Sequence, residues 1–283
     1  MRCRQHYVLG AVFVWMPLIG CASSSAPATS ETAALATDPW SHLRAMAGRY
    51  ATCRSYEDTG VLTSTRRPDD GSATTISRVL FRTAFERKGG AFRFEYEKVF
   101  EQHTTQQRAV IWRSSHGVAS TWATWRPQIA ETSLPDAIQA LAGVSGGTVR
   151  YVPPMLLGWA STSYHGLSFQ IEGDEQIGNA LCTKLSAHHG TRSVTLWLAK
   201  SDHSLRKLFE RDHLDGMPPQ EEELGRLIPA DTPEDRRQEL AELLRHPRPS
   251  TVEDSVEYAP VFDAVVDAER FQFMPPAVSG ETK

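Results

Sequence analysis

The stretch "TTISRVLFRTAFERKGGAFRFEYEKVF", from Thr74 to Phe100, decides the fold. Polar and apolar side chains alternate in both of its halves, with "RKGG" between them. Phe81 and Phe85 share one face of the first half. Phe92 and Phe94 share one face of the second. A period of two residues on either side of a glycine-rich turn is typical of a β-hairpin, so the stretch predicts two antiparallel strands with one apolar, aromatic face.

The same pattern continues along the chain. "QRAVIWRSSHGVASTWATW" predicts two strands joined by a Ser-Ser-His-Gly turn, and further strands are predicted at "LSFQIEG", "ALCTKLSAHHG", "TRSVTLWLAK" and "SLRKLFERDHL". The last extended stretches are "STVEDSVEYAPVFDAV" and "DAERFQFMPP". Several strands are apolar on both faces, which predicts that the sheet is covered on both faces.

Helices are predicted before and within this run of strands. "DPWSHLRAMAGRYATC" begins with Asp38 as a cap and Pro39 in the first turn. "SLPDAIQALAG" begins with Ser133 as a cap, and the proline-broken "YVPPMLLGW" that follows is apolar enough to serve as a lid. The pattern predicts an α+β domain, a single antiparallel sheet with helices packed against it.

The N-terminal residues have the pattern of an export signal. Arg2 and Arg4 precede an apolar run, 7–18, that is short for a membrane span. Its end, "LIGC", resembles a bacterial lipobox, in which the cysteine becomes the lipidated N-terminus, so Cys21 is the predicted lipidation site. An ordinary signal peptide or a short anchor helix with a chance cysteine is the alternative. Because Ala22 is not the aspartate that retains many lipoproteins at the inner membrane, we expect the outer membrane, facing the periplasm.

These patterns divide the chain into parts. Residues 1–20 are the predicted lipoprotein signal peptide, and the Ala-, Ser- and Thr-rich residues 21–37 a flexible tether. The globular domain is predicted at 38–276, with a helical insertion at 218–249, and residues 277–283 form a C-terminal tail.

Composition excludes some partners. Apolar residues make up 40% of the 283 residues, charged residues 23%, and the net charge is −4, so there is no basic patch of the kind that binds nucleic acid. "HHG" lies in a predicted turn without metal-ligand spacing, and no cofactor is expected. "GVSGG" has the G-x-S-x-G spelling of a hydrolase nucleophile, here Ser145, but a helix precedes it where that motif needs a strand.

The number of cysteines left in the exported domain indicates whether it contains a disulfide bond. Once the signal peptide and the lipidated cysteine are set aside, Cys53 and Cys182 remain as one pair. In an oxidising, exported setting such a pair predicts a disulfide. Two buried free thiols are the alternative.

The order of elements resembles the LolA and LolB lipoprotein carriers and the related sensor RseB. "FERKGGAFRFEY" resembles their strand–turn–strand segment, "SSHGVASTWATWRP" their turn and aromatic strand, and "VTLWLAKSDHSLRKLFERD" a later hairpin. The ending "DAERFQFMPPAV" is similar to theirs. The likeness runs from about Trp40 to Pro276, with Pro218 to Pro249 as extra material.

The resemblance implies an unclosed, strongly curved antiparallel β-barrel with helices covering its concave face. It also implies that the turn arginine, here Arg87, helps to close the cavity, although Lys88 stands where the family usually has proline. An exposed turn cation is the alternative for Arg87.

Two functions remain open from the sequence. The first is a non-enzymatic, membrane-anchored binder of an acyl chain, an acylated protein or another amphiphile. Its expected ligand-binding residues are Phe92, Phe94, Trp112, Trp122, Trp197 and Arg87. The second is an envelope structural or sensory lipoprotein that binds a protein partner, with the insertion as its contact surface. Side-chain spacing alone does not separate an apolar cavity from a filled core.

Overall fold

The computed structural model of the chain describes residues 38–100, 103–159, 164, 166–215, 234, 237–238, 241–242 and 249–276. The predicted signal peptide, the tether with Cys21 and the C-terminal tail lie outside these residues, as does most of the predicted insertion at 218–249. In the described ranges, no helix has both the length and the apolar character needed to cross a membrane.

A single antiparallel sheet contains all the strands that the structure describes. Their bounds are β1 (Ser55–Pro68), β2 (Thr75–Glu86), β3 (Ala91–Phe100), β4 (His103–Arg113), β5 (Ala119–Ala123), β6 (Arg126–Thr132), β7 (Phe169–Ile177), β8 (Ala180–His189), β9 (Arg192–Ala199), β10 (Leu205–Leu214), β11 (Ser250–Tyr258) and β12 (Val261–Phe262). The predicted hairpin is β2–β3, paired in register from Glu86 and Ala91 onward.

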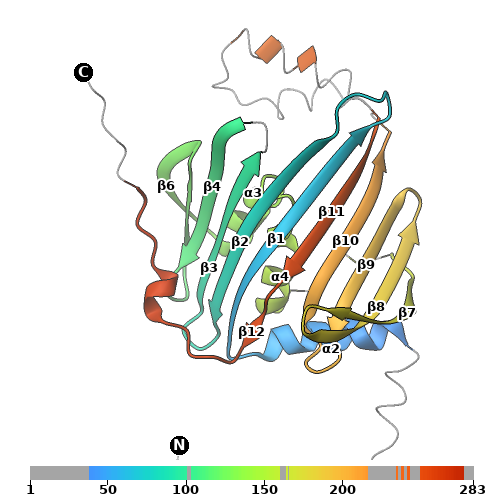
Figure 1. Cartoon of the computed structure of the whole chain (residues 1–283). Helices are drawn as coiled ribbons and strands as arrows, with labels where there is room; N and C mark the ends of the chain where they lie inside the picture. Colours follow the sequence, from blue (N-terminus) through green and yellow to red (C-terminus); the bar gives the residue numbers. More distant parts are fainter. Residues whose placement is uncertain are drawn as a thin grey trace, which may run out of the picture.

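The strand order explains the open shape of the sheet. It runs β6-β5-β4-β3-β2-β1-β11-β10-β9-β8-β7, with β12 paired to β1. Strands β1 to β6 therefore follow one another from the centre of the sheet to one edge. Strand β7 lies at the opposite edge, and β8 to β11 follow from there back to the centre, where β11 pairs with β1. The two edge strands do not pair with each other, so the sheet is curved but unclosed (Figure 1). The predicted fold class is confirmed.

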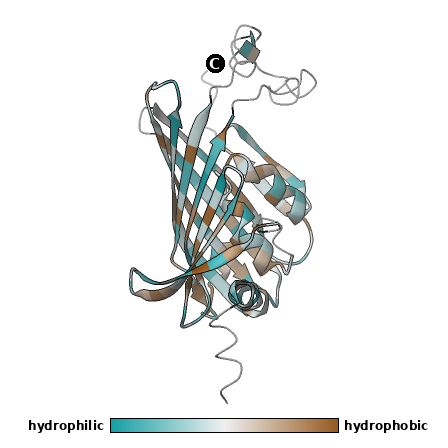
Figure 2. Ribbon diagram, turned by 90° about the vertical axis from the view of Figure 1, so that its right-hand side faces the viewer, coloured by the Kyte–Doolittle hydropathy of each residue, from teal (hydrophilic) through white to brown (hydrophobic). Residues whose placement is uncertain are grey.

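The described helices that precede β7 gather on one side of this sheet, which we call the concave face; the opposite side is the outer face (Figure 2). They are α2 (Pro39–Thr52), α3 (Leu134–Ala142), the short 3-10 helix η1 (Thr148–Arg150) and α4 (Val152–Leu156). Both predicted caps are confirmed, since the side chains of Asp38 and Ser133 accept hydrogen bonds from backbone N–H groups in the first turns of α2 and α3.

The main core lies between the concave face and these helices. The predicted aromatic faces of β2 and β3 point into it, and Phe92 and Phe94 are completely buried there. From the other side, α2 contributes Leu43, Met46 and Tyr50. Burying such large side chains supplies most of the driving force for folding.

Residues 263–276, which follow β12 and which we call the C-terminal segment, cover part of the outer face. The prediction that "DAERFQFMPP" is extended is wrong for part of this stretch. Residues Ala268–Phe271 form the 3-10 helix η3, with Asp267 as its cap. Phe271 packs against Ala84 and Ala91 on the outer face of β2 and β3. This contact attaches the C-terminal segment to the outer face of the sheet.

The predicted disulfide is wrong. Cys53 and Cys182 are both buried and both free. Cys53 follows α2 in the main core, where its thiol donates to the carbonyl oxygen of Tyr50. Cys182 lies on the outer face of β8, in a small cluster with Trp197 and Ala199. The sheet separates the two thiols, so no disulfide bridges them.

Candidate functional site

The concave interior is occupied by one continuous stretch of the chain, Leu134 to Leu157, which we call the inner segment. It contains α3, η1 and α4. Its buried side chains join the core of the sheet, and they include Leu134, Ile138, Leu141, Val149, Val152, Met155 and Leu156. The inner segment therefore fills the concave face with its own apolar side chains.

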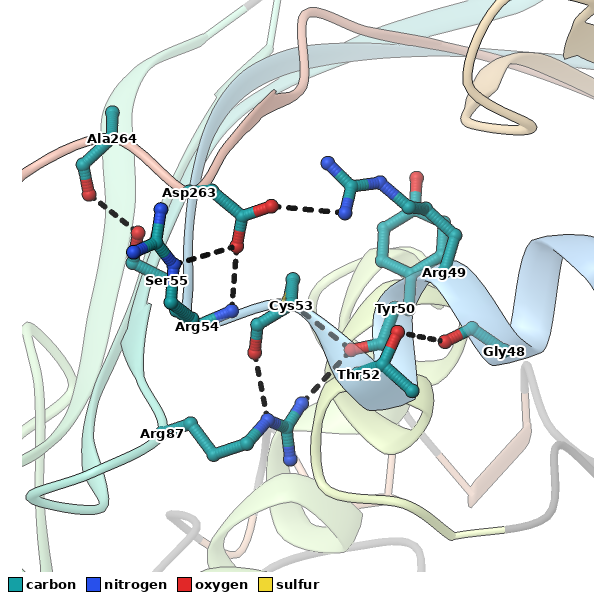
Figure 3. Close-up of polar contacts among 10 residues, drawn as sticks. All are labelled: Gly48, Arg49, Tyr50, Thr52, Cys53, Arg54, Ser55, Arg87, Asp263 and Ala264. Atoms are coloured by element: carbon teal, nitrogen blue, oxygen red, sulfur yellow. Dashed lines mark hydrogen bonds and ion pairs between the residues drawn. The ribbon is translucent and has the colours of Figure 1, made fainter. Parts of the chain in front are cut away.

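Arg87 ties the end of the inner segment to the rest of the protein. Its side chain comes from the β2–β3 turn and donates through Nε to the carbonyl oxygen of Cys53 at 2.7 Å. Through Nη2 it donates to the carbonyl oxygens of Tyr50 at 3.0 Å and Leu156 at 3.1 Å. Figure 3 shows the bonds from Arg87 to Cys53 and to Tyr50. We call Arg87 and these three carbonyl groups the arginine clamp.

The clamp has a physical basis in helix ends. The last carbonyl groups of a helix lack partners within the helix and carry partial negative charge. Tyr50 and Leu156 supply such carbonyls at the ends of α2 and α4. A guanidinium group has a planar set of donors and stays charged, so a single side chain can hold two helix ends together.

The end of α2 is also fixed from its other side. Arg49 forms an ion pair with Asp263 at 2.9 Å, and the backbone N–H of Arg54 donates to the same carboxylate at 2.6 Å (Figure 3). The hydroxyl group of Tyr50 accepts a hydrogen bond from the backbone of Leu205 on β10. These contacts hold α2 to the sheet, whereas α4 is connected to α2 through the clamp and through apolar packing.

A carboxyl group lies deep in this interior. Asp58 on β1 is buried, and the hydroxyl group of Tyr56 donates to its Oδ2 at 2.6 Å. Burial disfavours the charged form and raises the pKa of Asp58 to about 6, although Tyr56 and Thr83 act in the opposite direction. No motif in the sequence singled out Asp58. The inward positions of "SYEDTGVL", read every second residue, could have indicated it.

Two pockets flank the inner segment. One has a volume of about 500 Å³ and lies between the loop at Gly143 to Gly147 and charged residues of the sheet, among them Arg192, Glu210 and Asp254. The other has a volume of about 250 Å³ and lies between α3 and the edge strands β5 and β6. The half-exposed Trp125 lines this second pocket. The inner segment thus borders open space on both sides.

The structure divides the predicted ligand-binding residues between two faces. Phe92, Phe94 and Arg87 belong to the concave side, as expected. Trp112 and Trp122 instead pack against Phe273 of the C-terminal segment, with ring centroids 5.0 and 5.4 Å away. The expectation that these two residues line the concave face is wrong, because they alternate with the inward side chains of β4 and β5.

Trp197 also faces outward. The ammonium groups of Lys184 and Lys207 lie 5.6 and 5.4 Å from its ring centroid, and its indole N–H donates to Glu175. This residue belongs to the outer cluster of Cys182, so its predicted place in the concave face is wrong as well. Strand alternation showed that Trp197 faces away from Leu196, but it did not show which face is concave.

Ser145, the nucleophile candidate, is completely buried, and its hydroxyl group has no hydrogen-bond partner among the described residues. It lies in the loop that follows α3. Neighbouring Gly146 has a positive φ of 63° and passes so close to Leu62 that a Cβ atom there would lie 2.3 Å from the leucine side chain. The loop is therefore packed onto the sheet, and no substrate can reach this serine from solvent in the conformation observed.

No protein-family model and no curated protein matches the chain. Solved structures similar to it include a DUF1329 family protein from Desulfovibrio piger, with 9% identity over 83% of this chain and 98% of that one, and a TM-score of 0.30. A LolA superfamily protein from Nitrosomonas europaea has 11% identity over 83% of this chain and 97% of that one, with a TM-score of 0.29. A candidate outer membrane lipoprotein-sorting protein domain from Vibrio parahaemolyticus has 11% identity over 82% and 94%, with a TM-score of 0.29.

The chain's own strand order and helices carry the description of the fold: an unclosed antiparallel sheet with helices on its concave face, the architecture that the sequence predicted. At such low identity and TM-scores, a function for this chain has to be argued from its own residues.

Proposed function

We propose that this chain is a non-enzymatic lipoprotein of the bacterial envelope that binds the apolar part of an amphiphile on its concave face. The ligand is an acyl chain, or the acyl chains of an acylated protein. The lipid on Cys21 holds the protein at the membrane, and the domain takes up and hands over its ligand from there. The arginine clamp, which closes an apolar interior by hydrogen bonds to main-chain carbonyls, is the observation that carries the proposal.

In this mechanism the inner segment and the ligand compete for the same apolar surface. When Arg87 releases the carbonyl group of Leu156, α4 can leave the sheet while α2 stays in place, held by Asp263 and Leu205. The ligand then replaces the apolar side chains of the inner segment. Burying each methylene group is favourable by about 0.8 kcal/mol, so the acyl chain can offset the lost internal packing. Return of the inner segment and reformation of the clamp expel the ligand.

The clamp makes binding reversible because it favours the empty state. A carrier requires both a closed state of adequate stability and a barrier low enough for opening. Hydrogen bonds to three carbonyl groups meet both needs, since they are lost together when one side chain moves.

The test compares Arg87→Ala with Lys88→Ala, two substitutions in the same turn. Lys88 is exposed and takes no part in the clamp. Both are made in the Cys21→Ser protein, which cannot carry its own lipid anchor. We expect Arg87→Ala to take up a fluorescent apolar probe, displaceable by a fatty acyl lipid, more readily than the parent, and Lys88→Ala to match the parent. Equal uptake by the two variants, or uptake that no lipid displaces, would contradict the proposal.

A further inference from the structure

One row of residues crosses the middle of the concave face. Tyr258 on β11 pairs with Gly60 on β1, Gly60 pairs with Phe81 on β2, and Phe81 pairs with Tyr96 on β3. Next in the row comes Ala109 on β4. The two tyrosines therefore lie on either side of Phe81, in the part of the sheet that the inner segment covers.

Gly60 allows these rings to meet. A Cβ atom at this position would lie 2.1 Å from Cζ of Phe81, so the phenylalanine ring lies across the backbone of β1. In this position it makes an edge contact with the ring of Tyr258 at 5.5 Å between centroids. On its other side it stacks with Phe94, which contacts Tyr96. Two phenols joined by a phenylalanine pair thus form a continuous aromatic floor.

Both phenol groups of this floor are buried without a partner. Tyr258 is 6% exposed and Tyr96 is fully buried. Neither hydroxyl group has a hydrogen-bond partner among the described residues. Burial raises the pKa of both side chains above the ordinary value for tyrosine, so both hydroxyl groups keep their protons and remain donors.

Two other buried tyrosines, Tyr56 and Tyr151, have partners in this interior, whereas the hydroxyl group of Tyr164 is also unpaired among the described residues. The hydroxyl group of Tyr56 donates to Asp58, and that of Tyr151 donates to Glu210 at 2.8 Å. Buried polar groups are generally paired, because an unpaired one loses its hydrogen bonds to water without compensation. A phenylalanine at 96 or 258 would fill the same space without this cost. The two unpaired hydroxyl groups therefore have a use outside the closed state.

We propose that the hydroxyl groups of Tyr96 and Tyr258 donate hydrogen bonds to carbonyl oxygens of the bound ligand, which makes the ligand an ester-linked acyl lipid. This inference rests on the proposed function and specifies its ligand. An alkyl chain alone gives the phenols no acceptor, whereas each ester group places a carbonyl oxygen at the head of an acyl chain.

Asp58 disfavours the carboxylate of a free fatty acid as the acceptor for these phenols. It lies on β1 two residues before Gly60, on the same face. Burial raises the pKa of Asp58 to about 6, so above this pH the group is mostly ionised and repels a carboxylate, which disfavours a free fatty acid beside it. A neutral ester carbonyl accepts from the phenols without this repulsion.

The experiment uses two probes that differ only in these carbonyl groups: a short-chain diacylglycerol and the dialkylglycerol ether of the same chain length. Their affinities for the Cys21→Ser protein are measured by displacement of the fluorescent apolar probe. The variants are Tyr96→Phe and Tyr258→Phe, which keep the ring and remove the hydroxyl group. Tyr151→Phe is the control for loss of a paired phenol: because the bond from Tyr151 to Glu210 holds the inner segment, its removal affects both lipids alike, and the measured quantity is the ratio of ester to ether affinity.

We expect the parent to prefer the ester lipid and each row variant to lose about fivefold in affinity for it, with the ether affinity unchanged. The empty row variants should also unfold about 2–4 °C higher, since an unpaired buried hydroxyl group is removed. The ester preference of Tyr151→Phe should equal that of the parent.

Two results overturn the inference while leaving the proposed function in place: equal affinity of the parent for ester and ether lipids, or row variants that keep the full ester preference. Binding of neither lipid, even when Arg87→Ala opens the interior, overturns the proposed function itself.

Discussion

The guanidinium group of Arg87 donates to the carbonyl oxygen of Leu156 at 3.1 Å, although 69 positions separate the two residues in the chain. This bond joins the β2–β3 turn to the end of α4. The same side chain also donates to the carbonyl groups of Tyr50 and Cys53 at the end of α2. The stability of the closed state should therefore depend on the shape of this one side chain as well as on its charge.

Arg87→Lys keeps the charge and removes the planar group of donors. One ammonium group cannot reproduce the geometry in which Arg87 reaches three carbonyl oxygens. We expect the free energy of unfolding to fall by about 1–3 kcal/mol, measured by urea denaturation, and uptake of the apolar probe to lie between those of the parent and Arg87→Ala. If Arg87→Lys behaves as the parent in both measurements, charge alone closes the interior.

Asp58 should make stability depend on pH. Its pKa is raised from the ordinary value of 3.8 to about 6, so the folded protein holds this proton more tightly than the unfolded chain. The resulting stabilisation is complete below about pH 4 and is lost as the pH rises through about 6, a change of about 3 kcal/mol. Asp58→Asn should remove this part of the pH dependence in urea denaturation series. An unchanged pH profile would show that Asp58 does not titrate in this range.

Gly60→Ala should disturb the aromatic floor. The added methyl group would overlap the ring of Phe81, which has neighbours on both sides and cannot simply move away. We expect a loss of about 2–3 kcal/mol in the free energy of unfolding. Combining it with Phe81→Leu should recover part of this loss, because the smaller side chain leaves room. If the two substitutions lower the free energy of unfolding additively, the clash with Phe81 is not the cause of the loss.

Cys53 and Cys182 should react as free thiols once the protein unfolds. Burial is the main cause that raises the pKa of each thiol, which slows alkylation of the folded protein. We expect peptide mass spectrometry to find both cysteines alkylated after denaturation without a reducing agent, and both unmodified when the reagent meets the folded protein briefly. Recovery of a peptide pair linked by a disulfide would contradict the structure.

Phe273→Ala should weaken the outer face without affecting ligand binding. The ring of Phe273 contacts Trp112 and Trp122, and the guanidinium groups of Arg93 and Arg108 lie within 5.6 Å of its centroid. We expect a stability loss of about 1–3 kcal/mol and a red shift of tryptophan fluorescence. Lipid affinity should equal that of the parent. A loss of lipid affinity would show that Trp112 and Trp122 belong to the ligand-binding site.

Much of the fold could be predicted from local pattern. Alternation located the strands, turn residues located the hairpins, and Asp38 and Ser133 indicated where two helices begin. The pairing of β1 with β11 could not be read in this way, because the two strands are distant in sequence and nothing local marks them as neighbours. That pairing forms the centre of the sheet.

The site was predicted less completely, for a related reason. Alternation tells which side chains share a face, but the identity of the concave face depends on where the helices and the C-terminal segment pack. Trp112, Trp122 and Trp197 were therefore assigned to the wrong side. Arg87 was indicated by its turn and by the family resemblance. Its partner at Leu156 could be found only from the folded chain, as could the unpaired hydroxyl groups of Tyr96 and Tyr258.

Native mass spectrometry of the Cys21→Ser protein, purified from cells of a Gram-negative host, tests the central claim most directly. A protein that binds acyl lipids on its concave face should retain a lipid of defined mass, and Arg87→Ala should change the retained fraction while Lys88→Ala should not. Spectra that contain only the bare polypeptide for all three proteins, together with no uptake of added acyl lipid, would contradict the account.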